Sequence, residues 1–332
     1  MISVQPAQCD RLARCLDPLA VRPDEFVVTA ASPGERRREA NLMFFLVAIC
    51  QSTRTLQGTV DGRWVRGWDY MIATARRAMA ADPSFWTAER LQHIAPEALQ
   101  AVFSDDGLPE RSTLDRIDER VALLNDAAGV LLQKYGGDVM RLYEAAEHRL
   151  EGPQGILARL AACQAYSDPV AKKSFLLVMF AVRSGAWQVE DLERLKVAID
   201  YHIMRIALRS GMVEVQDPAL ARRLRNREVV SAEVDNAVRE AVREACDRLV
   251  AASGQQVFDV DNILWMIGRN CCHYDHDPIC GDNACWRMEA CSLLQGIAYD
   301  CPGRCPLDGV CLGSRHADYR ALWETTLYTH YY

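Results

Sequence analysis

The sequence predicts an all-α protein, and three observations support this fold class. Apolar residues recur at the helical spacing of 3.6 residues along most of the 332 positions. The alternation of apolar and polar residues that is typical of strands is almost absent, and Ala, Leu, Arg and Glu, which favour helices, are abundant. Hydrophobic residues make up 50% of the chain, enough to bury one large core or two ordinary ones.

Short segments rich in Gly, Pro and Asp separate the predicted helices, for example DGR at 61–63 and EGPQG at 151–155. We expect helices at residues 39–51, 67–81, 96–103, 112–135, 137–149, 154–165, 171–184, 189–209, 231–252 and 259–271.

Three regions of the chain differ in composition. Residues 1–38 are polar and weakly patterned, so we interpret them as an N-terminal extension. Residues 39–270 carry the helical periodicity and form the predicted core. Residues 271–332 contain a segment rich in Cys, Asp, Gly and Pro, which is typical of a small lobe organised by a metal.

The N-terminus lacks an apolar signal segment, and the longest apolar run, at 42–50, is too short to span a bilayer. We therefore expect a cytoplasmic, monomeric protein that does not bind membranes. The net charge of −7 argues against a broadly basic surface for nucleic acids. Basic runs at 34–39, 75–79 and 221–228 still allow a local basic groove, although each is also typical of a solvated helix face.

The thirteen cysteines are unevenly distributed, since eight of them lie between residues 271 and 311. Without a secretory signal, this density predicts a metal site rather than disulfides. Closely spaced thiols after a helix end suit a 4Fe–4S cluster, and the alternative is zinc, held by cysteines alone or with His273 or His276. The first set of ligands that we predict is Cys272, Cys280, Cys285 and Cys291, and an alternative or second set is Cys301, Cys305 and Cys311.

One part of this cysteine lobe resembles a known iron–sulfur loop. A helix ending in Gly268, Arg269 and Cys272, followed by Pro278 and Cys280, is similar to the loop of endonuclease III and the adenine glycosylases. The motif CPLDGVC at 305–311 resembles the element that closes that loop. The resemblance implies the helix-hairpin-helix DNA glycosylase superfamily, with two helical lobes, a catalytic cleft between them, and DNA containing a modified base as the partner.

A second motif, AIDYHIMRI at 198–206, resembles the segment that carries the catalytic aspartate of this superfamily. The resemblance implies that Asp200 stabilises the positive charge that develops on the sugar when the base leaves, which a preorganised anion in a dry pocket does well. The alternative is that Asp200 only caps the N-terminus of a helix at 201–209.

The segment at 166–185 falls where the superfamily has a hairpin and a lysine-led helix, although Pro169 and Ala171 replace the hairpin glycines. On this resemblance Lys173 is a catalytic residue that forms a Schiff base and gives lyase activity. The alternative is that Lys172 and Lys173 bind a phosphate group.

A separate resemblance covers more of the middle of the chain. Residues 95–138 are similar to the queuosine-5′-phosphate N-glycosylase (queuosine salvage) family, in which Lys172–Lys173 and Asp200–His202 also find counterparts. The segment DNILW at 261–265 echoes a further motif of that family. That family has no cysteine lobe. The two resemblances agree on the chemistry, which is cleavage of an N-glycosidic bond, but they differ on the substrate, which is DNA in one and a free nucleotide in the other.

Aromatic residues close to a carboxylate suit the stacking and reading of an extruded base. Trp64, Trp68 and Asp69 are therefore predicted to bind substrate, together with His202, although core packing explains them equally well. Asp105 and Asp106 are candidates for contacts to a sugar or base edge, but their SDDG segment is first of all typical of a turn.

The sequence thus predicts an N-glycosylase that hydrolyses the N-glycosidic bond of a modified base in DNA, for repair or for defence against modified phage DNA. The first alternative is a queuosine-type N-glycosylase that acts on a free nucleoside 5′-monophosphate. The second alternative is a non-catalytic nucleic-acid-binding protein whose metal lobe is structural.

Overall fold

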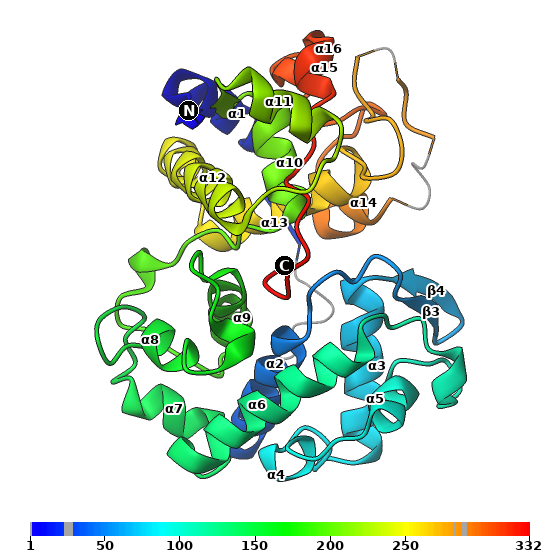
Figure 1. Cartoon of the computed structure of the whole chain (residues 1–332), viewed down its shortest axis with the longest axis vertical. Helices are drawn as coiled ribbons and strands as arrows, with labels where there is room; N and C mark the ends of the chain where they lie inside the picture. Colours follow the sequence, from blue (N-terminus) through cyan, green and yellow to red (C-terminus); the bar gives the residue numbers. More distant parts are fainter. Residues whose placement is uncertain (1, 23–28, 282, 287–290) are drawn as a thin grey trace. The chain divides into compact units, whose positions relative to one another are not determined.

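The computed structural model describes residues 2–22, 29–281, 283–286 and 291–332. Helices dominate, in agreement with the predicted all-α class (Figure 1). Among the described residues, the strands are two to four residues long and form three antiparallel pairs. Within the described ranges, helices that combine the length and the apolar character needed to cross a bilayer are absent.

The chain forms two compact units. The first unit combines Met1–Asp24 with Lys196–Thr329, and the second combines Glu25–Leu195 with His330–Tyr332. Asp200 and the cysteine-rich segment therefore belong to the first unit, whereas Lys172 and Lys173 belong to the second.

Helix α10 is central to the first unit, because it packs against α12, α13 and the short helices α15 and α16. Strands β1 and β5 pair from Ile2↔Val215 to Val4↔Val213, and β2 pairs with β6. The elements of this unit are α1 (Pro6–Leu16), α10 (Tyr201–Ser210), α11 (Pro218–Arg225), α12 (Ala232–Ser253), α13 (Val257–Asn270), α14 (Ser292–Gly296), α15 (Leu312–Arg315), α16 (Ala317–Arg320), β1 (Ile2–Val4), β2 (Ala20–Val21), β5 (Val213–Val215) and β6 (Ile297–Ala298).

Helix α2 is the core element of the second unit, because its C-terminal half is buried and it packs against α6, α7 and α9. A capping box starts this helix, in which Ser32 and Glu35 satisfy each other's backbone amides. The elements of this unit are α2 (Pro33–Ala48), α3 (Trp68–Ala81), α4 (Ala88–Leu91), α5 (Pro96–Val102), α6 (Ile117–Tyr135), α7 (Val139–Ala145), α8 (Ile156–Leu160), α9 (Lys172–Arg183), β3 (Gln57–Val60) and β4 (Arg63–Arg66).

One helix was not predicted, and one predicted helix begins later than expected. The weakly patterned N-terminal region contains α1, whose Leu12 and Leu16 are buried and which packs on α12. The helix predicted at 189–209 begins only at Tyr201, because the segment before it makes tertiary contacts instead. Asp191, for example, accepts hydrogen bonds from the backbone amides of Leu150 and Glu151.

Candidate functional site

Asp200 is the N-cap of α10. Its Oδ1 accepts hydrogen bonds from the backbone amides of His202 at 2.8 Å and Ile203 at 3.0 Å, and only 7% of the residue is exposed. This is the capping geometry that the sequence offered as the alternative to catalysis. It also holds the carboxylate in one orientation at the positive end of a helix, so the geometry of an N-cap and that of a preorganised anion coincide here.

The segment that leads into Asp200 is anchored to α12 and α13. The backbone amide of Ala198 donates to Asp261 Oδ1 at 2.8 Å, and the buried guanidinium of Arg239 donates to the carbonyl of Ile199 at 3.4 Å. These contacts fix the backbone on the N-terminal side of Asp200. Asp261 opens the DNILW motif, so this motif has a structural role in positioning the candidate catalytic residue.

His202 lies in the first turn of α10 and packs against α13. Its ring lies edge-on to Trp265 with the centroids 6.3 Å apart, and its Nδ1 is 3.0 Å from Arg205 Nη2. Gly268 of α13 allows this close approach, because a Cβ at that position would lie 2.7 Å from His202 Cβ. These contacts account for His202 as a packing residue, and its predicted role in substrate binding stays a prediction.

Two buried arginines of α10 connect this helix to the cysteine-rich segment. Arg205 donates to the carbonyl of Cys272 at 2.8 Å and pairs with the buried Glu324 at 2.8 Å. Arg209 donates to Cys272 Sγ at 3.3 Å and to the carbonyl of Leu322 at 2.7 Å. Neither arginine was predicted as a functional residue, although two arginines four residues apart in an otherwise apolar helix were an available signal.

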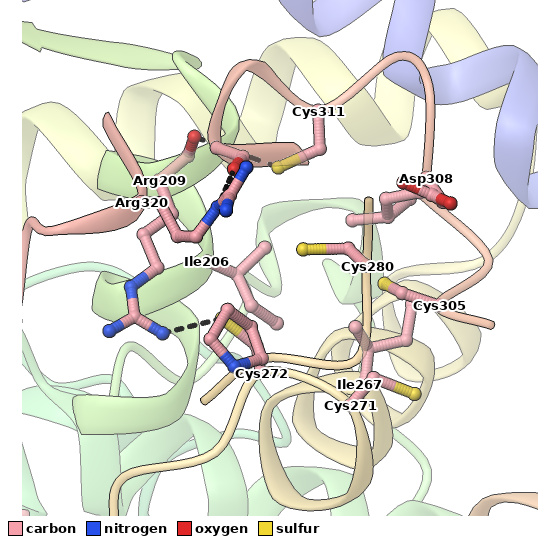
Figure 2. A pocket seen from close by; sticks show the side chains of 13 residues that line it. Ile206, Arg209, Ile267, Cys271, Cys272, Cys280, Cys305, Asp308, Cys311 and Arg320 are labelled. Atoms are coloured by element: carbon pink, nitrogen blue, oxygen red, sulfur yellow. Dashed lines mark hydrogen bonds between the residues drawn. The ribbon is translucent and has the colours of Figure 1, made fainter. Parts of the chain in front are cut away.

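Five cysteine side chains line one hollow of the first unit, which measures about 390 Å³ with its open mouth included (Figure 2). Two arginines, Arg209 and Arg320, also line it, and its apolar walls include Ile206, Ile267 and Leu307. The five cysteines are Cys271, Cys272, Cys280, Cys305 and Cys311.

The thiols at this hollow raise one another's pKa values. Burial, together with the nearby thiols of Cys305 and Cys272, raises the pKa of Cys280 to about 12. Burial and the same two neighbours also raise the pKa of Cys311 well above its ordinary value. The thiols of Cys272, Cys280, Cys305 and Cys311 are therefore neighbours, and a side-chain hydrogen bond with Cys271 contributes to a raised pKa of Cys305.

Cys285 and Cys291 of the first predicted set are not among the residues that line this hollow. Burial raises the pKa of Cys291, and the thiols of Cys285 and Cys301 contribute to the shift, so both lie near Cys291. Across the described part of the chain, groups of three or more His, Cys, Asp or Glu arranged to hold a single metal ion are absent.

In the second unit, Lys173 is completely buried near the start of α9. Its Nζ donates to the carbonyl of Ala48 at 2.6 Å and to Gln51 Oε1 at 3.0 Å. Burial lowers the pKa of this amine to about 7. Lys172 is also buried, and its Nζ lies 3.3 Å from Cys50 Sγ.

Ala171, where the resemblance to the helix-hairpin-helix glycosylases implied a glycine position, has a φ of +55°. The backbone thus adopts the left-handed conformation that glycine favours, although the residue is alanine. The side chain of Asp168 stabilises this turn by accepting hydrogen bonds from the amides of Val170 and Lys172.

The predicted aromatic substrate site lies on β4 and α3 of the second unit. Trp64 on β4 is 61% exposed, and Trp68 at the start of α3 stacks on Phe180 with the centroids 5.0 Å apart. Asp69 lies in the first turn of α3. Asp105 is engaged internally, since it accepts hydrogen bonds from the hydroxyl of Tyr70 at 2.7 Å and from the amide of Thr59 at 2.9 Å, both in this unit.

The structure divides the predicted site residues between the two units. The first unit holds Asp200, His202 and the cysteines from Cys271 to Cys311, and the second holds Lys172, Lys173, Trp64, Trp68 and Asp69.

Comparison with known proteins identifies the class to which part of the chain is similar. A family model described as "Queuosine salvage protein" matches residues 44–168, all of them in the second unit. No curated protein matches the chain. The match supports the resemblance first seen at 95–138 and extends it, whereas the resemblance to the helix-hairpin-helix glycosylases gains no support from it.

Proposed function

We propose that the protein is an N-glycosylase that releases a queuine-type base from a free nucleoside 5′-monophosphate. The observation that carries the proposal is the match of residues 44–168 to the queuosine salvage family. This reverses the order of preference from the sequence analysis, in which DNA came first and the nucleotide second. A helix-hairpin-helix fold and a cleft between two lobes have no comparable support.

The proposed reaction breaks the bond between C1′ of the sugar and a ring nitrogen of the base. The base leaves with the bonding electron pair and receives a proton, while water supplies the hydroxyl group that replaces it on C1′. Positive charge develops on the sugar during this step, so a fixed carboxylate lowers the barrier. Asp200 suits this role because two backbone amides orient its carboxylate and its surroundings largely exclude water.

The contacts of Lys173 on α9 favour a structural role for this residue over that of a Schiff-base nucleophile. Lys173 Nζ binds the carbonyl of Ala48, the last residue of α2, and the side chain of Gln51. An amine at this position satisfies backbone acceptors at the C-terminal end of a helix. We infer that Lys173 positions the end of α2, and lyase activity would require its amine to leave both acceptors.

A base-release assay tests the proposed function. Purified full-length protein is incubated with queuosine 5′-monophosphate, with the corresponding nucleoside, and with duplex DNA that carries a modified base, and free base is measured by mass spectrometry. We expect release from the monophosphate. Release from DNA alone would restore the first prediction from the sequence, and the absence of base release from every substrate would favour the non-catalytic alternative.

The variant Asp200→Asn tests the proposed catalytic residue, because asparagine keeps the cap and removes the charge. We expect base release to fall by about 100-fold or more, as for the loss of one electrostatic stabiliser of a transition state. Asp138→Asn is the matched control, since Asp138 is also an N-cap, accepts the amide of Met140 and is likewise 7% exposed. Equal activity in Asp200→Asn and the control would refute the assignment.

A further inference from the structure

The hollow lined by five cysteines is the strongest feature of the first unit that the proposed function leaves unused. Its thiols come from separate parts of the segment between residues 271 and 311. Backbone hydrogen bonds bring these parts together, since the amide of Cys305 donates to the carbonyl of Ile279 at 3.0 Å and that of Cys285 donates to Gly303 at 2.9 Å. The cysteine-rich segment therefore folds back on itself around the hollow.

Four of the five thiols are placed to share one ligand. Figure 2 shows Cys272, Cys280, Cys305 and Cys311 around the hollow, while Cys271 lies at its edge beside Ile267. Cys271, the C-cap of α13, contacts the thiol of Cys305 from that edge.

The charges around the hollow match those of an anionic cluster. Four thiolates and a cubane of iron and sulfide carry a net negative charge, which the guanidinium groups of Arg209 and Arg320 offset from the lining of the hollow. Arg209 donates directly to Cys272 Sγ, the type of hydrogen bond that tunes iron–sulfur centres. The carboxylate of Asp308 accepts hydrogen bonds from the amides of Gly281 and Gly309 and pairs with Arg304 at 3.4 Å.

A cluster and a single ion place four thiol ligands differently. A zinc ion draws four sulfurs to about 2.3 Å from one point, whereas a cubane spreads them around a larger volume. Here the thiols line one hollow together with the apolar side chains of Ile206, Ile267 and Leu307. We propose that Cys272, Cys280, Cys305 and Cys311 hold one 4Fe–4S cluster, a set that takes two members from each of the sets predicted from sequence.

The position of the site gives the cluster a structural role. Cys272 is bound through its Sγ by Arg209 and through its carbonyl by Arg205, both on α10. The same helix begins at the Asp200 cap. A cluster at this site would therefore hold the C-terminal half of the helix whose N-terminus presents the candidate catalytic carboxylate.

The test uses full-length protein purified without oxygen. We expect about four iron and four sulfide ions per chain, and absorbance near 400 nm that dithionite bleaches. Replacing any one of the four proposed ligands by serine should lower the iron content by more than half. Cys285→Ser and Cys301→Ser are the matched controls, because both lie in the same segment outside the hollow, and they should keep the iron.

Several results would overturn the assignment. One equivalent of zinc without sulfide would replace the cluster by a single ion, and loss of iron in Cys285→Ser but not in Cys305→Ser would move the ligand set. If the serine variants are insoluble, Arg209→Gln gives a second measurement: it should retain iron and shift the midpoint potential of the cluster, and an unchanged potential would contradict the hydrogen bond to Cys272. None of these measurements depends on base release, so they stand apart from the proposed function.

Discussion

Replacing Lys173 by methionine removes a completely buried amine and should change how the stability of the second unit depends on pH. Burial lowers the pKa of this amine from an ordinary 10.5 to about 7. Between these two values the unfolded chain binds a proton that the folded chain does not. The free energy of unfolding of the wild-type protein therefore rises with pH in this window, and the contribution disappears in Lys173→Met.

The size of the effect follows from the two pKa values. A difference of one pKa unit between the folded and unfolded states corresponds to about 1.4 kcal/mol of stability. In the folded protein the amine is half protonated at pH about 7, which is its own pKa. Raising the pH from 7 to 9 should therefore add about 2 kcal/mol to the stability of the wild-type protein relative to the variant. The hydrogen bonds lost to Ala48 and Gln51 lower the stability of the variant at every pH, so they do not alter this difference in slope.

Urea denaturation followed by circular dichroism at pH 7, 8 and 9 measures the difference. Lys134→Met is the control, because Lys134 is an exposed lysine on α6 of the same unit, and this variant should keep the wild-type slope. If Lys173→Met and the wild-type protein gain the same stability between pH 7 and 9, the amine is charged in the folded protein and the reasoning from burial is refuted.

The further predictions concern three substitutions: Gly268→Ala and Glu324→Gln change the surroundings of α10, and Gly129→Ala changes the interior of α6. Gly268→Ala should lower the stability of the first unit by about 1–3 kcal/mol, because the new Cβ would lie 2.7 Å from His202 Cβ. Gly129→Ala on α6 should instead raise the stability of the second unit by about 1 kcal/mol, because its new Cβ meets no atom closer than 3.9 Å and alanine favours a helix more than glycine does. Thermal unfolding of both variants checks this opposition of sign, and destabilisation of equal size would contradict it. Glu324→Gln leaves the buried guanidinium of Arg205 without its anion and should cost about 3–5 kcal/mol, which urea denaturation would detect as a lower midpoint.

Helical periodicity and caps were sufficient to locate several long helices. The prediction at 231–252 corresponds to α12 at Ala232–Ser253, and that at 259–271 corresponds to α13 at Val257–Asn270. These helices have strong apolar spacing, and Ser231 caps α12 in the expected way. Their local sequence and their tertiary environment favour the same structure.

The start of α10 could not be located in this way, because tertiary contacts compete with helix formation before Asp200. Asp191 binds the amides of Leu150 and Glu151, and Asp261 binds the amide of Ala198. Periodicity describes only neighbours along the chain, so it could not detect partners that lie forty or more residues away.

By itself, the sequence determined the helical class, the position of Asp200 at a helix start as one of two interpretations, and the concentration of cysteines after residue 271. Only the tertiary structure decided which thiols meet. Cys305 and Cys311 follow Cys280 by more than twenty residues, and a return of the chain past Ile279 brings them to the same hollow. Spacing along a loop does not specify such a return, because the backbone hydrogen bonds that close it join residues far apart in the chain.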